Sequence, residues 1–363
     1  MTAEQWEKLL AVLNGELFEP LPVGFIIDSP WLPGWAGPVR NSTKGNVIQK
    51  GEISNGAGMS TLDYFSSEQM WFEANLKAVR QFPDIMFLPG FWAEFGMCTE
   101  PSAFGAKCTW RQNELPYAGK IITDIQQVHS LDKPNPKTDG LLPFVLNRLK
   151  HYQGQIEQAC HTIKFAVSRG PLNVASFLAG STEFLMAIRT NPEETHQLLE
   201  IVTDFIVDWL ELQAQTFPSI DGIFILDDIV GFLGEEDFEE TALPYLERIF
   251  QSLDVTVKFF HNDAPGLVCA PHLPQIGVNL FNFSFQHTLA RMKELTNNAV
   301  TLLGNIATVD VLAAGAPEDV HNSVKAALES VSDRSRLILS CGGGMPPDVS
   351  TENIEAFLSA AGY

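Results

Sequence analysis

The chain has 363 residues, of which 45% are hydrophobic and 18% are charged, and its formal net charge is −21. This composition predicts one large hydrophobic core and excludes a mostly disordered chain. The negative charge, with no cluster of Lys and Arg, excludes nucleic acid and anionic membranes as expected partners.

Residues 1–19 are predicted to form an amphipathic helix, because Trp6, Leu9, Leu10 and Leu13 recur at helical spacing. The segment lacks the basic start and the cleavage site of a signal peptide, and the sequence holds no stretch of about 18 apolar residues that could span a membrane. The five cysteines are odd in number and form no CxxC motif, which favours reduced thiols. We therefore expect a cytoplasmic protein.

Eight short apolar runs are predicted as strands, and helical patterns separate most of them. The strands are expected at Val23–Ile27, Ile85–Pro89, Phe165–Ser168, Gly222–Leu226, Val257–Phe260, Val278–Phe281, Thr301–Gly304 and Leu337–Ser340. The helices are expected at Met70–Gln81, Asn191–Thr216, Asp237–Gln251, Ala316–Val331 and Thr351–Ala361. Strands that alternate with helices indicate a parallel sheet, so the sequence predicts an α/β fold with a single (β/α)8 TIM barrel over residues 1–363.

Two long stretches interrupt the alternation of strands and helices. Residues 31–61 are rich in Gly, Pro, Ser and Asn, and residues 99–143 are only weakly periodic. Long loops in a compact domain are usually functional. We therefore expect both stretches to cap the mouth of the barrel.

Polar residues follow each predicted strand. In chain order they are Asp28, Glu94 and Glu100, Arg169, Asp227 and Asp228, His261 and Asp263, Asn282 and Ser284, Asn305, and Ser340 with Cys341. The C-terminal ends of barrel strands lie at one face, where active sites form. These side chains are therefore expected to converge on one mouth.

His261 and Asp263 are two residues apart, and on an extended chain that spacing points both side chains to the same side. With Cys341 from the eighth strand they would provide the N, O and S ligands that suit zinc. In the alternative interpretation, His261 bonds the backbone at a strand end and Cys341 is a small core residue.

Four further positions are candidates for contact with a substrate. Glu94 and Glu100 lie among aromatic residues and could form a pocket wall or a solvated loop. Asn305 and Gly343 follow the last two strands, and the run Gly342–Gly344 permits close approach of a ligand. No Lys-Ser/Thr pair follows these glycines, so they do not form a phosphate-binding P-loop.

Asp227 and Asp228 are adjacent at the end of the fourth predicted strand. Adjacent carboxylates repel each other when they are buried, so one of them could hold a proton near neutral pH and act as a general acid. A capping or loop carboxylate is the alternative.

Several short motifs together resemble the uroporphyrinogen decarboxylase superfamily, which includes corrinoid-dependent methyltransferases such as the methylcobamide:coenzyme M methyltransferases. The motifs are Phe82–Met86, Glu100–Gly105, Gly170–Leu172, Ala242–Tyr245, Gly304–Ile306, and Ser340–Gly344 followed by Glu352–Ile354. Their order and spacing extend the resemblance from about Pro22 to Phe357. The resemblance also implies a (β/α)8 barrel.

The resemblance implies two alternative activities. The methyltransferases bind zinc through His-x-Cys after strand five and Gly-Cys-Gly after strand eight. Here His261 matches the histidine, whereas Asp263 and Gly343 stand at the two cysteine positions, with Cys341 two residues before Gly343. The decarboxylases need no cofactor and use an aspartate that matches Asp84, together with N-terminal arginines that this chain lacks before residue 40.

We expect a corrinoid-linked methyltransferase that acts on a small molecule. The candidate catalytic residues are His261, Asp227, Asp228 and, for the decarboxylase alternative, Asp84; zinc would bind His261, Asp263 and Cys341. A partner protein would supply the corrinoid. The alternatives are a carboxy-lyase that acts on a tetrapyrrole without a cofactor and a non-catalytic barrel that binds a corrinoid or tetrapyrrole; a homodimer fits each of them.

Overall fold

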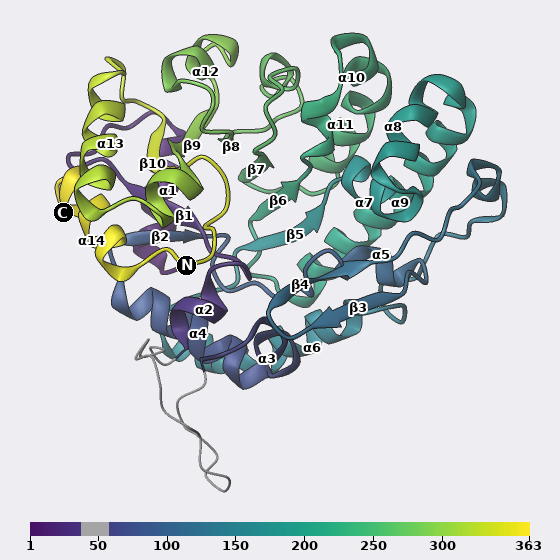
Figure 1. The fold of residues 1–363 in the computed structure, drawn as a ribbon, viewed down its shortest axis with the longest axis horizontal. Coiled ribbons are helices and arrows are strands. Elements are labelled where there is room, and N and C mark those ends of the chain that lie inside the picture. The colour runs from purple at the N-terminus through teal and green to yellow at the C-terminus, as the bar shows by residue number, and fades with distance from the viewer. Residues whose placement is uncertain (38–57) are drawn as a thin grey trace, which may run out of the picture.

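The computed structural model describes residues 1–37 and 58–363, and its centre is an eight-stranded parallel sheet (Figure 1). The hydrogen-bonded order is β2-β1-β10-β9-β8-β7-β6-β5. These strands are β1 Val23–Ile26, β2 Ile85–Leu88, β5 Phe165–Arg169, β6 Gly222–Leu226, β7 Val257–Asn262, β8 Leu280–Phe283, β9 Thr301–Ile306 and β10 Leu337–Cys341. All eight expected strands are present, each within about two residues of its predicted bounds.

The sheet curls, and β2 and β5 stand at the two ends of its strand order. Aromatic residues that follow β2 lie between these ends. The ring of Phe91 lies 5.5 Å from that of His161, just before β5, and the ring of Trp92 lies 6.3 Å from that of Phe224 in β6. The described residues thus show a curled, barrel-like α/β sheet, and they show no β2–β5 ladder that would close the barrel.

Helices cover the outside of the curled sheet, as Figure 1 shows. The helices of the described residues are α1 Ala3–Leu13, α2 Leu32–Ala36, α3 Thr61–Ser66, α4 Glu68–Gln81, α5 Thr99–Ala103, α6 Leu142–Gln158, α7 Pro171–Ala179, α8 Ser181–Thr190, α9 Pro192–Thr216, α10 Glu235–Thr241, α11 Leu243–Gln251, α12 Leu289–Leu295, α13 Pro317–Glu329 and α14 Thr351–Ala361. Between β7 and β8 the chain forms only a short 3-10 turn, Ala270–His272. The alternation of strands and helices is therefore incomplete at that connection.

Three expected helices illustrate how local sequence sets helix bounds. The helix expected from Asn191 begins one residue later, at Pro192, whose fixed φ suits the first turn. The helix expected at Asp237–Gln251 is instead divided into α10 and α11 by Ala242, because Pro244 starts a new first turn. The N-terminal helix ends at Leu13, short of residue 19, because Gly15 adopts a φ of +89° that a helix cannot continue.

The stretch 99–143 holds more regular structure than the sequence suggested. It contains α5, an antiparallel hairpin of β3 (Cys108–Arg111) and β4 (Glu114–Ala118), and a 3-10 helix over Ile125–Ser130. These elements are four to six residues long, too short for hydrophobic periodicity to reveal. In the other expected cap, residues 38–57 lie outside the described residues.

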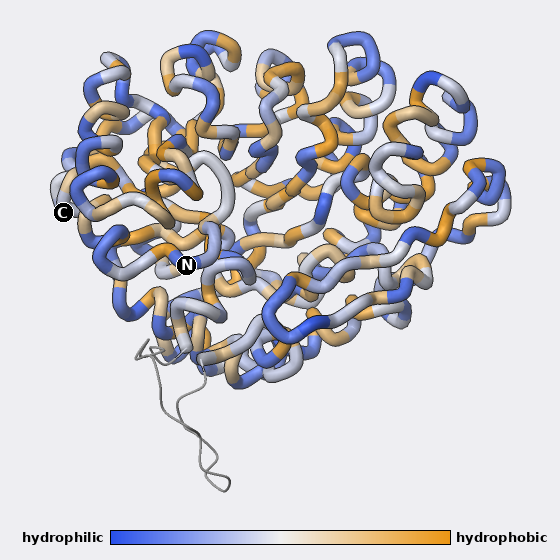
Figure 2. Tube along the Cα trace, viewed as in Figure 1, coloured by the Kyte–Doolittle hydropathy of each residue, from blue (hydrophilic) through white to orange (hydrophobic). Residues whose placement is uncertain are grey.

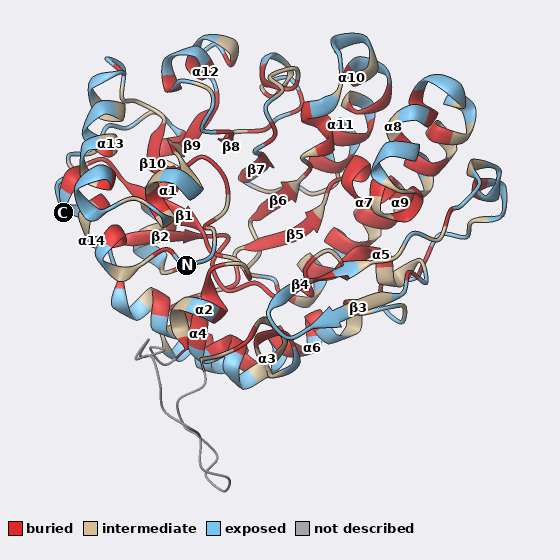
Figure 3. Ribbon diagram, in the orientation of Figure 1, coloured by how far each residue is buried: buried red, intermediate tan, exposed pale blue. Residues whose placement is uncertain are grey.

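Aromatic side chains fill the end of the curled sheet that lies opposite the expected mouth. Trp6 of α1 packs edge-on against Phe165 of β5, with 5.6 Å between the ring centroids. The stacked rings of Phe224 and Phe259 lie 4.2 Å apart. Figures 2 and 3 show the strands as apolar and buried. This packing leaves the C-terminal ends of the strands as the place for polar chemistry.

Within residues 1–37 and 58–363, no single helix is long and apolar enough to cross a membrane. The pair α7 and α8 reaches that length only across a bend of 105°.

Candidate functional site

The register of the sheet brings polar residues of neighbouring strands to one level at its C-terminal edge. Arg169 of β5 pairs with Leu226 of β6, Leu226 with His261 of β7, and His261 with Asn282 of β8. Residues at one level of a parallel ladder point to the same face. Arg169, His261 and Asn282 therefore form one row across the mouth.

Asn282 fixes the orientation and the tautomer of His261. The side-chain amide nitrogen of Asn282 donates to the carbonyl oxygens of Leu303 (2.7 Å) and Cys341 (3.1 Å), so its oxygen must be the atom that faces His261. That oxygen lies 2.8 Å from Nδ1 of His261. Nδ1 therefore carries the hydrogen, and in the neutral ring Nε2 presents a free lone pair.

Two carboxylates face this lone pair. Nε2 of His261 lies 3.6 Å from Oδ1 of Asp228 and 3.9 Å from Oδ2 of Asp263. Oδ1 of Asp228 also accepts a hydrogen bond from the Asp263 backbone N–H, at 3.2 Å. Burial is the largest influence on the pKa of Asp263 and raises it. His261 acts in the opposite direction, and the charge of Asp228 raises the pKa further. The donor atoms of Asp228, His261 and Asp263 all lie within 4.8 Å of one another, a spacing that a metal ion could bridge.

Cys341 is placed differently from the sequence expectation of a ligand set with His261 and Asp263. Its side chain is fully buried, and its thiol donates to the carbonyl oxygen of Gly343 at 3.3 Å. Burial raises the pKa of the Cys341 thiol to about 12. The group of donor atoms around His261 contains Asp228 and not Cys341. In β9, Leu303 pairs with Asn282 of the His261 row, whereas Cys341 pairs with Ile306, three residues further along the strand.

Two glycines after β10 let carboxylates approach the mouth closely. A Cβ atom on Gly343, whose φ is +139°, would lie 2.8 Å from Oδ2 of Asp263. A Cβ atom on Gly344 would lie 2.5 Å from Oδ2 of Asp28. Gly343 was expected to bind substrate; in the structure it adjoins Asp263. Residues without side chains are therefore required at both positions for the observed arrangement.

A buried ion triad forms one wall of the mouth. The Arg169 guanidinium donates to Glu94 at 2.8 Å and to Glu100 at 3.4 Å, and the Arg169 backbone N–H donates to Glu100 at 3.1 Å. Burial opposes the charge of Arg169, but the two glutamates outweigh burial and raise its pKa above the usual value. Ser29 also donates to Glu94, at 2.9 Å. Glu94 and Glu100, for which the sequence left a pocket wall or a solvated loop open, are thus buried and held by Arg169.

A cavity of about 200 Å³ lies beside His261 and Asp263. Its lining residues are Ile26, Asp28, Pro30, Leu226, His261, Asp263, Gly344, Met345 and Pro346. Oδ1 of Asp28 is inaccessible to solvent and has no hydrogen-bond partner. Burial raises the pKa of Asp28 well above its usual value, and the nearby carboxylates of Glu94 and Asp263 add to the shift.

Asp227 serves the fold at this end of the sheet. Its side chain is fully buried, and its two oxygens accept hydrogen bonds from the backbone N–H groups of Leu172 (2.8 Å) and Asn173 (3.1 Å) in the first turn of α7. Burial raises the pKa of Asp227 to about 8, whereas these N–H groups act in the opposite direction. Asp227 faces the start of α7, and the cavity lining does not include it.

Two other candidates do not reach this cavity. Asp84 precedes β2, whereas the site follows the strands, so its exposed side chain lies at the opposite end of the sheet. Asn305 at the end of β9 donates from its amide nitrogen to the carbonyl oxygen of His287. The structure thus brings His261, Asp228 and Asp263 together and leaves Asp84 and Asn305 apart from them.

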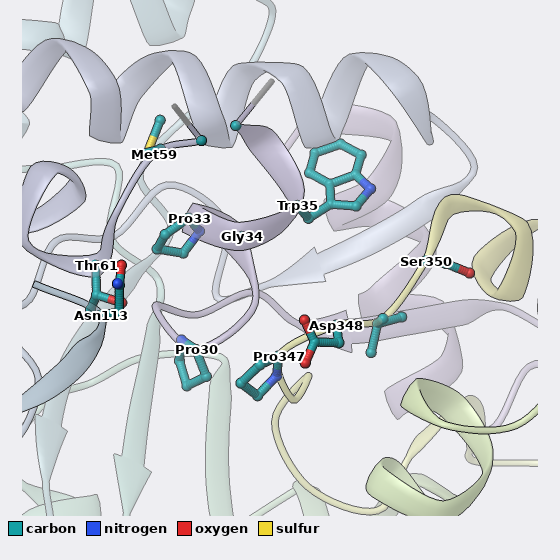
Figure 4. Close-up of a pocket in the computed structure, with 13 residues that line it drawn as sticks. Pro30, Pro33, Gly34, Trp35, Met59, Thr61, Asn113, Pro347, Asp348 and Ser350 are labelled. Carbon is teal, nitrogen blue, oxygen red and sulfur yellow. The ribbon is translucent and has the colours of Figure 1, made fainter. Parts of the chain in front are cut away.

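A larger cavity of about 570 Å³ lies beside the small one and shares Pro30 with it. Its walls include Pro33, Trp35, Met59 and Asp348, and Figure 4 shows Pro30 beside Pro347 in this lining. Gly37 and Gly58, which also line it, flank the residues outside the described part. The small cavity holds the histidine, so we place the chemistry there.

Asp28, Arg169 and Asn282 gain roles that the sequence could not assign. Each was recognisable as a polar residue after an apolar strand. The hydrogen-bond partners of Arg169 and Asn282 lie 21 to 75 residues away in the chain. No local signal specifies those partners, because they arise from the register of the sheet.

This chain is similar to one protein family, to curated relatives with two different activities and to a solved structure. Residues 44–362 match the family model described as uroporphyrinogen decarboxylase (URO-D). The chain is 23% identical over 270 residues to a methylated-thiol–coenzyme M methyltransferase of Methanosarcina mazei, covering 74% of this chain and 70% of that protein. It is 24% identical over 371 residues to a uroporphyrinogen decarboxylase of Xanthomonas oryzae pv. oryzae, covering 98% and 97%. A solved methyltransferase from Methanosarcina mazei superposes with a TM-score of 0.73 at 17% identity over 98% of both chains, which supports the fold.

Proposed function

Since the chain belongs to the uroporphyrinogen decarboxylase family, we propose that it is a methyltransferase that acts on a small molecule and works with a corrinoid supplied by a partner protein. One observation carries this proposal: Nε2 of His261 presents a lone pair toward Asp228 and Asp263 at the mouth of the sheet. This arrangement fits a metal-assisted transfer better than a reaction without a cofactor. The curated methyltransferase relative supports the same choice.

The donor set fits zinc. Zinc takes imidazole nitrogen and carboxylate oxygen as ligands, at about 2.0–2.2 Å. The separations of 3.6 and 3.9 Å between Nε2 and the two carboxylate oxygens are too long for hydrogen bonds but suit donors to one cation. Asp228, His261 and Asp263 would hold the ion. When bound, zinc would lower the pKa of a thiol so that it reacts as the thiolate.

The residues around the ligands have distinct supporting tasks. Asn282 keeps the His261 ring in one orientation and one tautomer through the hydrogen bond to Nδ1. Gly343 leaves room for Asp263. The apolar side chains of Ile26 and Leu226 in the cavity lining exclude water from the reacting groups.

A carboxy-lyase is the second candidate, because a uroporphyrinogen decarboxylase aligns over nearly the whole chain. The charge of the site opposes a substrate with many carboxylates. Among the described residues of the mouth, the guanidinium of Arg169 is already bonded to Glu94 and Glu100. Each buried carboxylate of the substrate that found no cation would cost several kcal/mol, an order-of-magnitude figure for desolvating a charge.

Elemental analysis of protein purified without a chelator tests the metal. We expect about one equivalent of zinc, bound more weakly at acidic pH because imidazole must be deprotonated to act as a ligand. His261→Ala should lose the ion. His129→Ala is the matched control, because Nε2 of His129 also faces a carboxylate, Glu194 at 3.8 Å, but its side chain is 50% exposed.

Activity assays separate the two candidate reactions. Transfer of a methyl group from a methylated corrinoid to a thiol, lost in His261→Ala, would support the proposal. Release of carbon dioxide from uroporphyrinogen at an enzyme-like rate would refute it. Zinc below roughly a tenth of an equivalent, unrestored by added zinc, would remove the metal from the proposal.

A further inference from the structure

Two free cysteines, Cys98 and Cys108, adjoin each other between α5 and the β3–β4 hairpin. Cys98 directly precedes α5, and Cys108 is the first residue of β3. The thiol of Cys98 lies within hydrogen-bonding reach of the Cys108 side chain and of the Thr109 backbone N–H. The two residues are therefore a reduced pair of neighbouring thiols.

The backbone brings the two cysteines together independently of their side chains. After α5, the N–H of Ala106 donates to the carbonyl oxygen of Pro101 at 3.1 Å, a bond that closes the turn behind a helix. The hairpin then passes the residues that precede α5, since the ring of Trp110 lies 6.2 Å from that of Phe95. The approach of the thiols is thus built into the path of the chain.

The two thiols differ in their access to solutes. Cys98 is completely buried, whereas Cys108 is only partly buried. Burial raises the pKa of the Cys98 thiol, the adjoining Cys108 raises it further, and the Thr109 N–H acts in the opposite direction. Because the thiolate is the nucleophile in disulfide exchange, Cys108 is the thiol that a dissolved oxidant meets first.

The pair also lies next to the wall of the mouth. Cys98 stands two residues before Glu100, which accepts hydrogen bonds from the backbone N–H of Arg169 (3.1 Å) and from its guanidinium (3.4 Å). A covalent bond from Cys98 to Cys108 would join the β3–β4 hairpin to the segment that carries Glu100. The hairpin would then lose its freedom to move away from this wall.

We propose that Cys98 and Cys108 form a reversible disulfide, which fastens the β3–β4 hairpin to the wall of the mouth under oxidising conditions. The oxidant is a small-molecule disulfide such as glutathione disulfide. The inference depends on neither the proposed metal nor the proposed methyl transfer, because it uses only residues outside that donor group.

The exchange balances in two steps. The Cys108 thiolate attacks one sulfur atom of the small disulfide, whose S–S bond breaks, and one small thiolate leaves. The Cys98 thiolate then attacks the Cys108 sulfur atom of the mixed disulfide and expels the second small thiolate. The two protons lost by the cysteines end on the two small thiols. Two electrons pass from the cysteine pair to the small disulfide, and an excess of small thiol reverses both steps.

Peptide mass spectrometry of the full chain tests the bond. The folded protein is incubated with glutathione disulfide, free thiols are blocked with iodoacetamide, and trypsin digests the chain without reduction. Trypsin cleaves after Lys107 and so separates the two cysteines. We expect a disulfide-linked pair of peptides that dithiothreitol releases. Glutathione on the exposed Cys160 without any Cys98–Cys108 link would overturn the inference.

Hydrogen exchange of the hairpin measures the consequence of the bond. Oxidation should slow amide exchange over residues 108–118 about tenfold or more, because closing a short loop restricts local opening. Dithiothreitol should return the original rates. Equal rates in the oxidised and reduced chains would contradict the proposed fastening of the hairpin.

Two variants assign the effect to the pair. Oxidation should leave hairpin exchange unchanged in Cys108→Ser, whereas Cys160→Ser, which changes an exposed cysteine, should respond like the unchanged chain. Slower exchange on oxidation of Cys108→Ser would refute the assignment. If Cys108→Ser fails to fold, the linked peptides and the exchange rates of the unchanged chain still decide the question.

Discussion

Replacing Arg169 with methionine should destabilise the protein strongly, because the change leaves two buried carboxylates without their cation. The exposed fractions of the three side chains are 13% for Arg169, 9% for Glu94 and 3% for Glu100. Breaking a buried ion pair by removing one partner costs about 3–5 kcal/mol. The shift in Tm equals the lost free energy of unfolding divided by the unfolding entropy, which is about 2 cal/mol/K per residue. For a chain of this length the Tm should therefore fall by roughly 4–7 °C.

Thermal and urea denaturation, followed by circular dichroism, measure this loss. Arg111→Met is the matched control, because Arg111 and Glu114 are 63% and 61% exposed, and we expect no measurable change there. Adding Glu94→Gln and Glu100→Gln to Arg169→Met should recover most of the stability, since no unpaired charge then remains. The reasoning is refuted if Arg169→Met is no less stable than the control, or if the added glutamines recover nothing.

Three further predictions concern two residues beside the proposed metal ligands and one buried histidine. Gly343→Ala would place a Cβ atom 2.8 Å from Oδ2 of Asp263 and should weaken zinc binding about tenfold or more, measured by competition with a chromophoric chelator. Gly105→Ala, also at a positive φ (+88°) but with open space around it, should leave that affinity unchanged. Asn282→Leu removes the hydrogen bond to His261, the proposed metal ligand, and should weaken zinc binding roughly 10–100-fold; unchanged affinity would contradict the orienting role of Asn282. Burial lowers the pKa of His161 from 6.5 to about 4, so the unfolded chain takes up more protons and stability falls as the pH falls between those values. The free energy of unfolding, measured by urea titration, should fall less between pH 7 and pH 4 in His161→Phe than in the unchanged chain, by up to about 3 kcal/mol. An equal fall in both proteins would contradict the assignment of this pH dependence to His161.

Hydrophobic patterning was sufficient to predict the strands and most of the layout. All eight strands were found from short apolar runs, and α14 matches its predicted bounds. Helix α6 was missed, although Leu142, Val145, Leu149 and Tyr152 carry a helical spacing. Gly154 and the polar residues among them weakened that pattern. The hairpin β3–β4 was missed because each strand is too short to show alternation.

The sequence anticipated part of the arrangement around His261, and the structure places Cys341 and Asp84 away from it. His261 and Asp263 share a strand end, so their proximity follows from a spacing of two residues. The third member of the group is Asp228, where the sequence suggested Cys341. This difference depends on how the ends of β6, β7 and β10 meet in the folded sheet. Asp84 was matched by motif, but its position before β2 puts it at the other end of the sheet.

The sequence by itself determined the residue types at each strand end, the acidic balance of the chain and the order of its elements, because these are local properties of composition and periodicity. Only the tertiary structure decided which of those residues meet. The level of each side chain depends on the register between strands that are far apart in the chain, and a shift of one residue would turn the side chain to the other face. The contacts of His261 with Asn282 and of Arg169 with Glu94 and Glu100 follow from that register and from the packing of the segment after β2.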